Sequence, residues 1–117
     1  MAKFCIDIDE NTFNRFKLGE VPAFDKIYYA YNKKLFGFVF KILKTEADTK
    51  EIVQEIFVKV WINKARITNL TLLDSYLFTI AYNASIDLIR KKIIKKRYVD
   101  YVKSLQLNYF ENIWKDL

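Results

Sequence analysis

The densest group of charged side chains in this sequence is a run of six cations within residues 90–97. The whole chain carries 20 Lys and Arg against 14 Asp and Glu, a net charge of +6, and this run accounts for the excess. Ammonium and guanidinium groups bind phosphates, so a local cluster indicates a polyanionic partner, either nucleic acid or an anionic membrane. The same charges would also complement the negative end of a helix macrodipole, and charge alone does not decide between the two interpretations.

A second set of polar side chains forms a stripe at helical spacing. Asp48, Glu51 and Glu55 follow one another at steps of three and four, and Gln54 lies beside them. Carboxylates near the start of a helix favour its dipole, so the stripe is typical of an ordinary solvated face. It is equally suited to be a docking edge for a basic protein, where charges act through complementarity and association rate.

Three further side chains are suited to contacts with bases. Asn83 falls in the middle of a helical pattern, where Asn is neutral to unfavourable, and its amide can bond a base edge. Tyr76 and Tyr82 can stack on unpaired bases, although tyrosines at helical spacing are more often part of a core or its rim.

Helical periodicity predicts the elements that hold these groups. Apolar residues recur at steps of three and four over 24–44. The sequence TEAD at 45–48 has the form of a capping box, in which the Thr hydroxyl and the Asp carboxylate bond backbone N–H groups, so a second helix is expected to begin there. Residues 63–74 are polar and aperiodic, which predicts a loop, and a third helix is expected over 74–97.

Shorter elements flank these three helices. Alternating apolar residues at 4–8 indicate an extended arm. A brief helix is expected to end near Gly19, with a break at Pro22. Residues 98–117 again have helical spacing.

Composition predicts an all-α fold. Hydrophobic residues make up 52% of the 117 residues and aromatic residues 17%, with two Gly and one Pro. A chain of 117 residues has the length of a single domain, and it is long enough to bury a core. We expect a compact bundle of three principal helices with a short N-terminal helix and a C-terminal linker helix. The domain is expected to cover 1–97, including an arm at 1–22, and residues 98–117 to form an amphipathic tail.

Missing residue types exclude several kinds of chemistry. The sequence has no His and a single Cys, Cys5, which argues against zinc sites, His-based catalysis and an intrachain disulfide. We therefore expect a cytoplasmic protein that is not an enzyme and that holds no metal or other cofactor. The longest apolar run, 35–40, is far shorter than the ~20 residues of a membrane-spanning helix, so no membrane insertion is expected.

Three stretches of the chain resemble region 2 of sigma factors of the extracytoplasmic-function (ECF) group. AFDKIYYAYNKKLFGFVFKILK resembles the first helix of that region. ADTKEIVQEIFVKVW resembles its polymerase-docking helix, and SYLFTIAYNASIDLIRKK the helix that reads the promoter minus-ten element. The resemblance covers roughly residues 13–97. It implies an all-α domain that takes part in transcription initiation.

The resemblance also implies roles for particular residues. Those expected to bind the clamp helices of the largest subunit of the RNA polymerase core are Asp48, Glu51, Gln54 and Glu55. Those expected around a base flipped out of the promoter duplex are Asn63, Lys64, Arg66 and Asn69. Those expected to bind promoter DNA are Asn83, Arg90, Lys91, Lys92, Lys95 and Lys96. An anti-sigma protein is a further partner implied by analogy with the group.

The family's fourth region, a helix-turn-helix for the minus-thirty-five element, is absent from this sequence. Residues 98–117 resemble the start of the linker that leads to it, so we expect either a domain excised from a longer protein or a one-domain regulator. Two alternatives remain open. One is a basic helical module that binds nucleic acid without polymerase. The other is a protein-interaction bundle whose tail docks a partner helix through Tyr109, Phe110 and Trp114.

Overall fold

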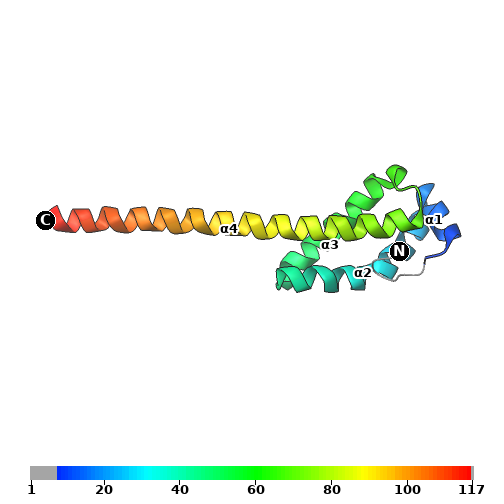
Figure 1. Cartoon of the computed structure of the whole chain (residues 1–117), viewed down its shortest axis with the longest axis horizontal. Helices are drawn as coiled ribbons and strands as arrows, with labels where there is room; N and C mark the ends of the chain where they lie inside the picture. The colour runs from blue at the N-terminus through cyan, green and yellow to red at the C-terminus, as the bar shows by residue number, and fades with distance from the viewer. Residues whose placement is uncertain (1–7, 117) are drawn as a thin grey trace. The chain divides into compact units, whose positions relative to one another are not determined.

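The computed structural model describes the backbone of residues 8–116, and their side chains except at 110 and 114–116. Its elements are α1 (Glu10–Lys17), α2 (Val21–Leu43), α3 (Glu46–Ile62), the short 3-10 helix η1 (Lys64–Arg66) and α4 (Leu70–Asp116), as Figure 1 shows. No strand occurs over residues 8–116, so the all-α prediction is confirmed. Most of the extended arm expected at 4–8 lies outside the described residues.

The chain divides into two units, Met1–Ile86 and Asp87–Leu117, which are described separately below. The first holds α1, α2, α3, η1 and the start of α4, and the second holds the rest of α4.

The connection between α1 and α2 depends on the chain's first glycine and its proline. Gly19 follows α1 with φ +85°, a conformation that suits glycine, and its N–H donates to the Phe16 carbonyl over 2.9 Å. The predicted helix end near Gly19 is confirmed. The predicted break at Pro22 is wrong, because Pro22 lies in the first turn of α2. An N–H in that turn has no intrahelical partner, so proline costs the helix nothing there.

The start of α3 differs in detail from the predicted capping box. Thr45 is the N-cap residue, as expected, but its hydroxyl makes no capping bond to a backbone N–H. It donates instead to Asp48 Oδ2 over 2.6 Å, because a carboxylate is a strong acceptor for a hydroxyl proton. The Thr49 hydroxyl donates to the Thr45 carbonyl over 2.7 Å. The predicted start of the helix is therefore right, whereas the predicted bond from a backbone N–H to the Thr45 hydroxyl is wrong.

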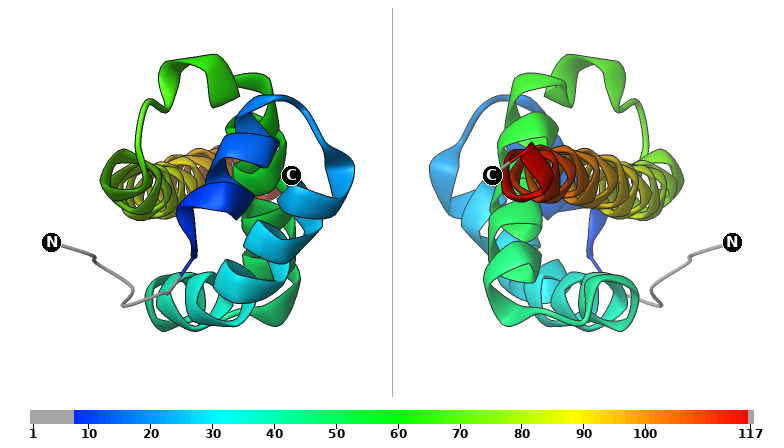
Figure 2. Two further views of the ribbon diagram at one scale, coloured as in Figure 1. Left: turned by 90° about the vertical axis from the view of Figure 1, so that its right-hand side faces the viewer. Right: turned by 90° about the vertical axis from the view of Figure 1, so that its left-hand side faces the viewer.

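One face of each helix contributes to the core of the unit Met1–Ile86, and Figure 2 shows these helices gathered together. Its most deeply buried apolar side chains are Phe16, Ile27, Tyr31, Leu35, Val39, Ile56, Val60, Leu73, Leu77 and Ala81. Within α2, α3 and α4 these residues recur at steps of four, which puts them on one face of each helix. Phe38 of α2 and Phe78 of α4 also meet, with ring centroids 5.0 Å apart.

A polar pair is buried within this core. The Tyr31 hydroxyl of α2 donates to Asp74 Oδ1 of α4 over 3.1 Å, and the two residues are only 2% exposed. Burial, with the charge of Asp74 and this hydrogen bond, raises the pKa of Tyr31 above its ordinary value of about 10. The sequence placed Asp74 where a loop meets a helix and offered no sign that it would be buried.

Replacing Tyr31 with Phe is expected to lower the free energy of unfolding by about 1.5 to 3 kcal/mol, the usual range for a hydrogen bond to a charged group. The change is also expected to alter the pH dependence. Above pH ~10 the unfolded chain loses a phenol proton that folded Tyr31 keeps, so wild-type stability falls as pH rises, and the variant lacks this contribution. Urea unfolding followed by circular dichroism between pH 7 and 11 measures both effects.

Tyr29→Phe is the matched control, because Tyr29 is 78% exposed on the same helix. It is expected to leave stability unchanged at pH 7. Equal stabilities for the two variants would show that the buried hydrogen bond contributes nothing measurable.

The third helix and the tail helix, predicted as two elements, form the single helix α4. It begins earlier than predicted, because Asn69 Oδ1 accepts from the Leu72 N–H over 2.9 Å and caps its first turn. The predicted loop over 63–74 is thus too long, and its last residues are helical. The predicted helix end near residue 97 is wrong: α4 continues to Asp116, and no Gly or Pro occurs between Leu70 and Asp116 to end it.

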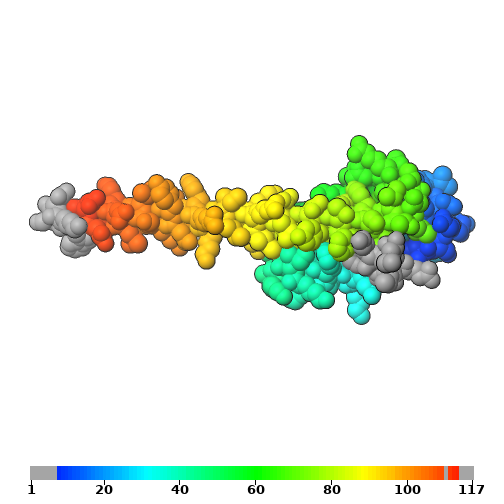
Figure 3. Space-filling model, in the orientation of Figure 1, coloured from blue at the N-terminus to red at the C-terminus, as the bar shows by residue number. Residues whose placement is uncertain are grey.

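In the unit Asp87–Leu117, the side chains of residues 91–101 and 103–109 are all exposed, and their surface is yellow to orange in Figure 3. Exposed residues of this segment include large apolar ones, such as Tyr98 at 68% and Leu107 at 65%. Val102, Leu105, Gln106 and Tyr109 line a shallow hollow on one side of the helix. The tail is therefore helical, as predicted, with an apolar face.

Candidate functional site

The exposed side of α3 carries the predicted polar stripe. Glu51, Gln54 and Glu55 are exposed, while Ile52 and Ile56 of the same helix are buried. Asp48 differs from the other stripe residues, since it is half-buried and accepts a hydrogen bond from the Thr45 hydroxyl. Three of the four residues predicted for docking thus share an exposed surface, and the fourth also stabilises the start of the helix.

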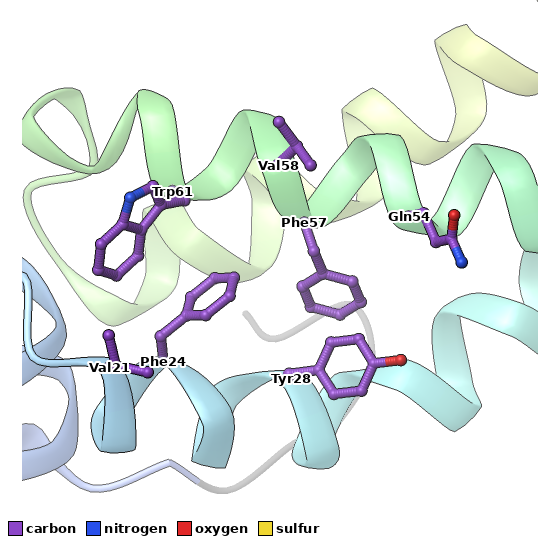
Figure 4. Close-up of a pocket in the computed structure, with 7 residues that line it drawn as sticks. All are labelled: Val21, Phe24, Tyr28, Gln54, Phe57, Val58 and Trp61. Carbon is purple, nitrogen blue, oxygen red and sulfur yellow. The ribbon is translucent and has the colours of Figure 1, made fainter.

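Next to this stripe lies an apolar groove between α2 and α3, with a volume of about 670 Å³. Its lining residues, drawn in Figure 4, are Val21, Phe24, Tyr28, Gln54, Phe57, Val58 and Trp61. Gln54 belongs both to this groove and to the polar stripe. The groove therefore continues the predicted docking surface toward α2.

Aromatic rings form much of the groove. The ring centroids of Phe24 and Trp61 lie 5.1 Å apart, and those of Tyr28 and Phe57 lie 4.7 Å apart, within the range of favourable ring contacts. Val21 and Val58 are each 57% exposed. Such a groove can receive the apolar side chains of a partner helix.

This groove was not predicted from the sequence, although Phe24 and Tyr28 belong to the apolar pattern over 24–44. Periodicity shows which side chains point toward a neighbouring helix, but it does not show how far that neighbour covers them. A useful signal was present in Val58, an apolar residue next to the acidic stripe.

The segment between α3 and α4 is held at several points. Asn63 Nδ2 donates to the Lys59 carbonyl and to Tyr76 Oη, each over 3.0 Å. The ammonium of Lys64 lies 4.2 Å from the centre of the Trp61 ring, a favourable cation–π distance, and the Lys64 carbonyl accepts a hydrogen bond from Lys17 Nζ. These contacts order a segment that the sequence predicted only as a loop.

A second hollow of about 250 Å³ lies where this segment meets α4. Its lining residues are Arg66, Ile67, Leu72, Ser75, Tyr76 and Thr79. Of the four residues predicted around a flipped base, only Arg66 is in this lining. Asn63 and Lys64 brace the segment instead, and Asn69 caps α4. Ser75 and Thr79 were not predicted as site residues.

The residues predicted to bind DNA are exposed. Asn83 and its neighbour Tyr82 are exposed on the part of α4 that belongs to the first unit. In the second unit, the five predicted cations Arg90, Lys91, Lys92, Lys95 and Lys96 are all exposed. Exposure leaves their charged groups accessible to a polyanion, which is the minimum that DNA binding requires.

Two absences apply to the described part of the chain. Residues 8–116 include no helix that combines the length and apolar character needed to span a bilayer. Among the side chains that the structure describes, Asp and Glu form no group of three or more that could hold a metal ion.

An all-α domain with a polar docking stripe, an apolar groove and a basic helix fits the sequence family described as Sigma-70 region 2, whose profile matches residues 27–93. The chain belongs to this family. It is also 30% identical over 76 residues to the ECF RNA polymerase sigma factor SigW of Bacillus subtilis (strain 168).

The alignment with SigW covers 65% of this chain and 41% of SigW, so the chain spans about two fifths of that relative's length. No solved structure matches the chain. The resemblance to an ECF sigma factor region 2, inferred above from the sequence, is confirmed by the family match and by the similarity to SigW.

Proposed function

We propose that this domain docks on RNA polymerase through α3 and binds the opened minus-ten element of a promoter through α4 and the segment before it. The observation that carries the proposal is the juxtaposition on α3 of the exposed stripe Glu51, Gln54 and Glu55 with the apolar groove. Membership of the Sigma-70 region 2 family and the similarity to an RNA polymerase sigma factor support polymerase as the partner.

Docking on the clamp helices would use two kinds of contact. The groove provides apolar surface, where burial of a few side chains supplies most of the binding energy. The carboxylates of Glu51 and Glu55 provide complementary charge for a basic partner, which chiefly raises the association rate. Gln54, common to the stripe and the groove, would lie near the centre of such an interface.

Contacts with the opened promoter would use the second hollow and α4. The hollow lined by Arg66, Ser75, Tyr76 and Thr79 offers an apolar wall and several polar groups, as a pocket for a flipped base requires. Asn83, which is exposed, would bond a base edge, and the exposed cations of residues 90–96 would hold phosphates.

The domain would act without catalysis, as an initiation factor in the cytoplasm, where polymerase and promoter are found. A protein inhibitor of the anti-sigma type would compete with polymerase for the exposed surfaces. The activity of a longer protein of which this domain is part would depend on further regions.

The proposal predicts a preference for forked over fully paired DNA. We expect the 117-residue chain to bind a fluorescein-labelled promoter fork about 10-fold more tightly than the matching duplex, because the fork spares the cost of extruding a base. Fluorescence anisotropy measures both affinities, and a pull-down with the isolated clamp helices tests docking.

Equal affinity for the two DNAs would reject base capture. Binding to DNA without binding to the clamp helices would favour the alternative of a basic nucleic-acid module. Binding to neither would favour the alternative of a protein-interaction bundle.

A further inference from the structure

Tyr76 lines the second hollow, and its hydroxyl is bonded by a residue that does not line it. Asn63 Nδ2 donates to Tyr76 Oη and to the Lys59 carbonyl, and Asn63 is not part of the lining. A carbonyl oxygen only accepts hydrogen bonds, so the nitrogen of the Asn63 amide, rather than its oxygen, must face Lys59. Both hydrogens of that nitrogen are then engaged, which defines the orientation of the amide.

This arrangement determines whether the Tyr76 hydroxyl can donate a hydrogen bond to a ligand. A phenol oxygen that accepts from Asn63 keeps its own hydrogen for another acceptor. Arg66, in the same lining, carries only donors, and the Ser75 and Thr79 hydroxyls can donate as well as accept. The hollow is therefore better supplied with donors than with acceptors.

We propose that Asn63 is a positioning residue for base capture, which holds the Tyr76 hydroxyl as a donor to a carbonyl oxygen of the captured base. The inference rests on the proposed function above. Thymine, cytosine and guanine each carry a carbonyl oxygen, whereas adenine has none and presents an amino group, itself a donor. The hollow accordingly takes a carbonyl-bearing base in preference to adenine.

A double-mutant cycle on the 117-residue chain tests this inference. The variants are Asn63→Ala, Tyr76→Phe and the two combined, and the probes are four fluorescein-labelled forks whose first unpaired base is C, T, G or A. We expect the wild type to bind the carbonyl-bearing forks roughly 3- to 10-fold more tightly than the adenine fork, the effect of one neutral hydrogen bond. Each single variant should lose this preference, and the double variant should lose no more than either single variant.

Asn14→Ala is the control for loss of an amide, because Asn14 is exposed on α1 and lines neither hollow. It should keep the base preference. Thermal unfolding and affinity for fully paired DNA, measured on every variant, separate a loss of fold from a loss of base selection.

Additive effects in the cycle, or a preference that survives Asn63→Ala, would overturn the role of Asn63. A wild type that prefers forks to duplex but does not distinguish the four bases would overturn this inference and leave the proposed function intact. A wild type with no preference for forks would reject base capture and this inference with it, whereas docking on the clamp helices is tested separately by the pull-down.

Discussion

Replacing Val58 with glutamate is expected to weaken binding to the polymerase clamp helices by about 30-fold or more. Val58 lines the groove between α2 and α3 and is 57% exposed, so the change adds a charge to the groove without entering the core. A partner side chain that fills the groove would have to bury that carboxylate, and residues at the centre of an interface commonly contribute about 2 kcal/mol or more. Isothermal titration with a purified clamp-helix fragment measures the loss.

Two further variants show which part of the docking surface matters. Leu18→Glu adds the same charge at an apolar residue that is 81% exposed outside the groove, and it should bind normally. The triple variant Glu51→Ala, Gln54→Ala, Glu55→Ala should bind the clamp helices roughly 5- to 10-fold more weakly than the wild type. The loss should come mainly from a slower association rate and should be largest at low salt. If Val58→Glu and the triple variant both bind like the wild type, α3 does not dock on the clamp helices.

Neutralising four cations of α4 is expected to remove most of the salt dependence of DNA binding. If about five cations of residues 90–97 contact phosphates, the slope of log affinity against log salt is near −4 to −5, and wild-type affinity falls roughly 250- to 1000-fold between 50 and 200 mM salt. In the variant Arg90→Gln, Lys91→Gln, Lys95→Gln, Lys96→Gln, the slope should become shallower by about 3 to 4. Anisotropy titrations at several salt concentrations give the slope.

The matched control removes the same net charge from α2. Its changes are Lys26→Gln, Lys33→Gln, Lys34→Gln and Lys41→Gln, and all four side chains are exposed. This control should keep a slope close to that of the wild type. Equal slopes for the two variants would mean that the overall charge of the chain, rather than the cluster on α4, attracts DNA.

Much of the fold follows from local patterns in the sequence. Apolar residues at steps of three and four predicted the buried face of α2, and TEAD predicted where α3 begins. Helix type and inward face are set by side-chain spacing and by nearby capping groups, which are local properties. The predicted break at Pro22 failed because the same proline can end one helix or begin the next, and only the surrounding chain decides which.

The surface positions of the candidate site were predictable for a similar reason. Glu51, Gln54 and Glu55 lie opposite the buried face of α3, so their exposure follows from the helical period. The family resemblance then attached expected roles to these positions, and the match to Sigma-70 region 2 confirmed the family. The docking and DNA-binding roles themselves stay predictions.

Features that join distant parts of the chain depended on tertiary structure. The groove exists because α2 and α3 leave Phe24, Val58 and Trp61 partly uncovered, and the extent of that cover is a property of two helices together. Likewise, Asn63 reaches Tyr76 only because α3 and α4 meet at that point. By itself the sequence determined the helical character of these segments, the start of α3 and the side that α2 buries, because those choices are made within a few neighbouring residues. Hollows and long-range hydrogen bonds were decided only by packing, since they depend on distances between segments that sequence spacing does not specify.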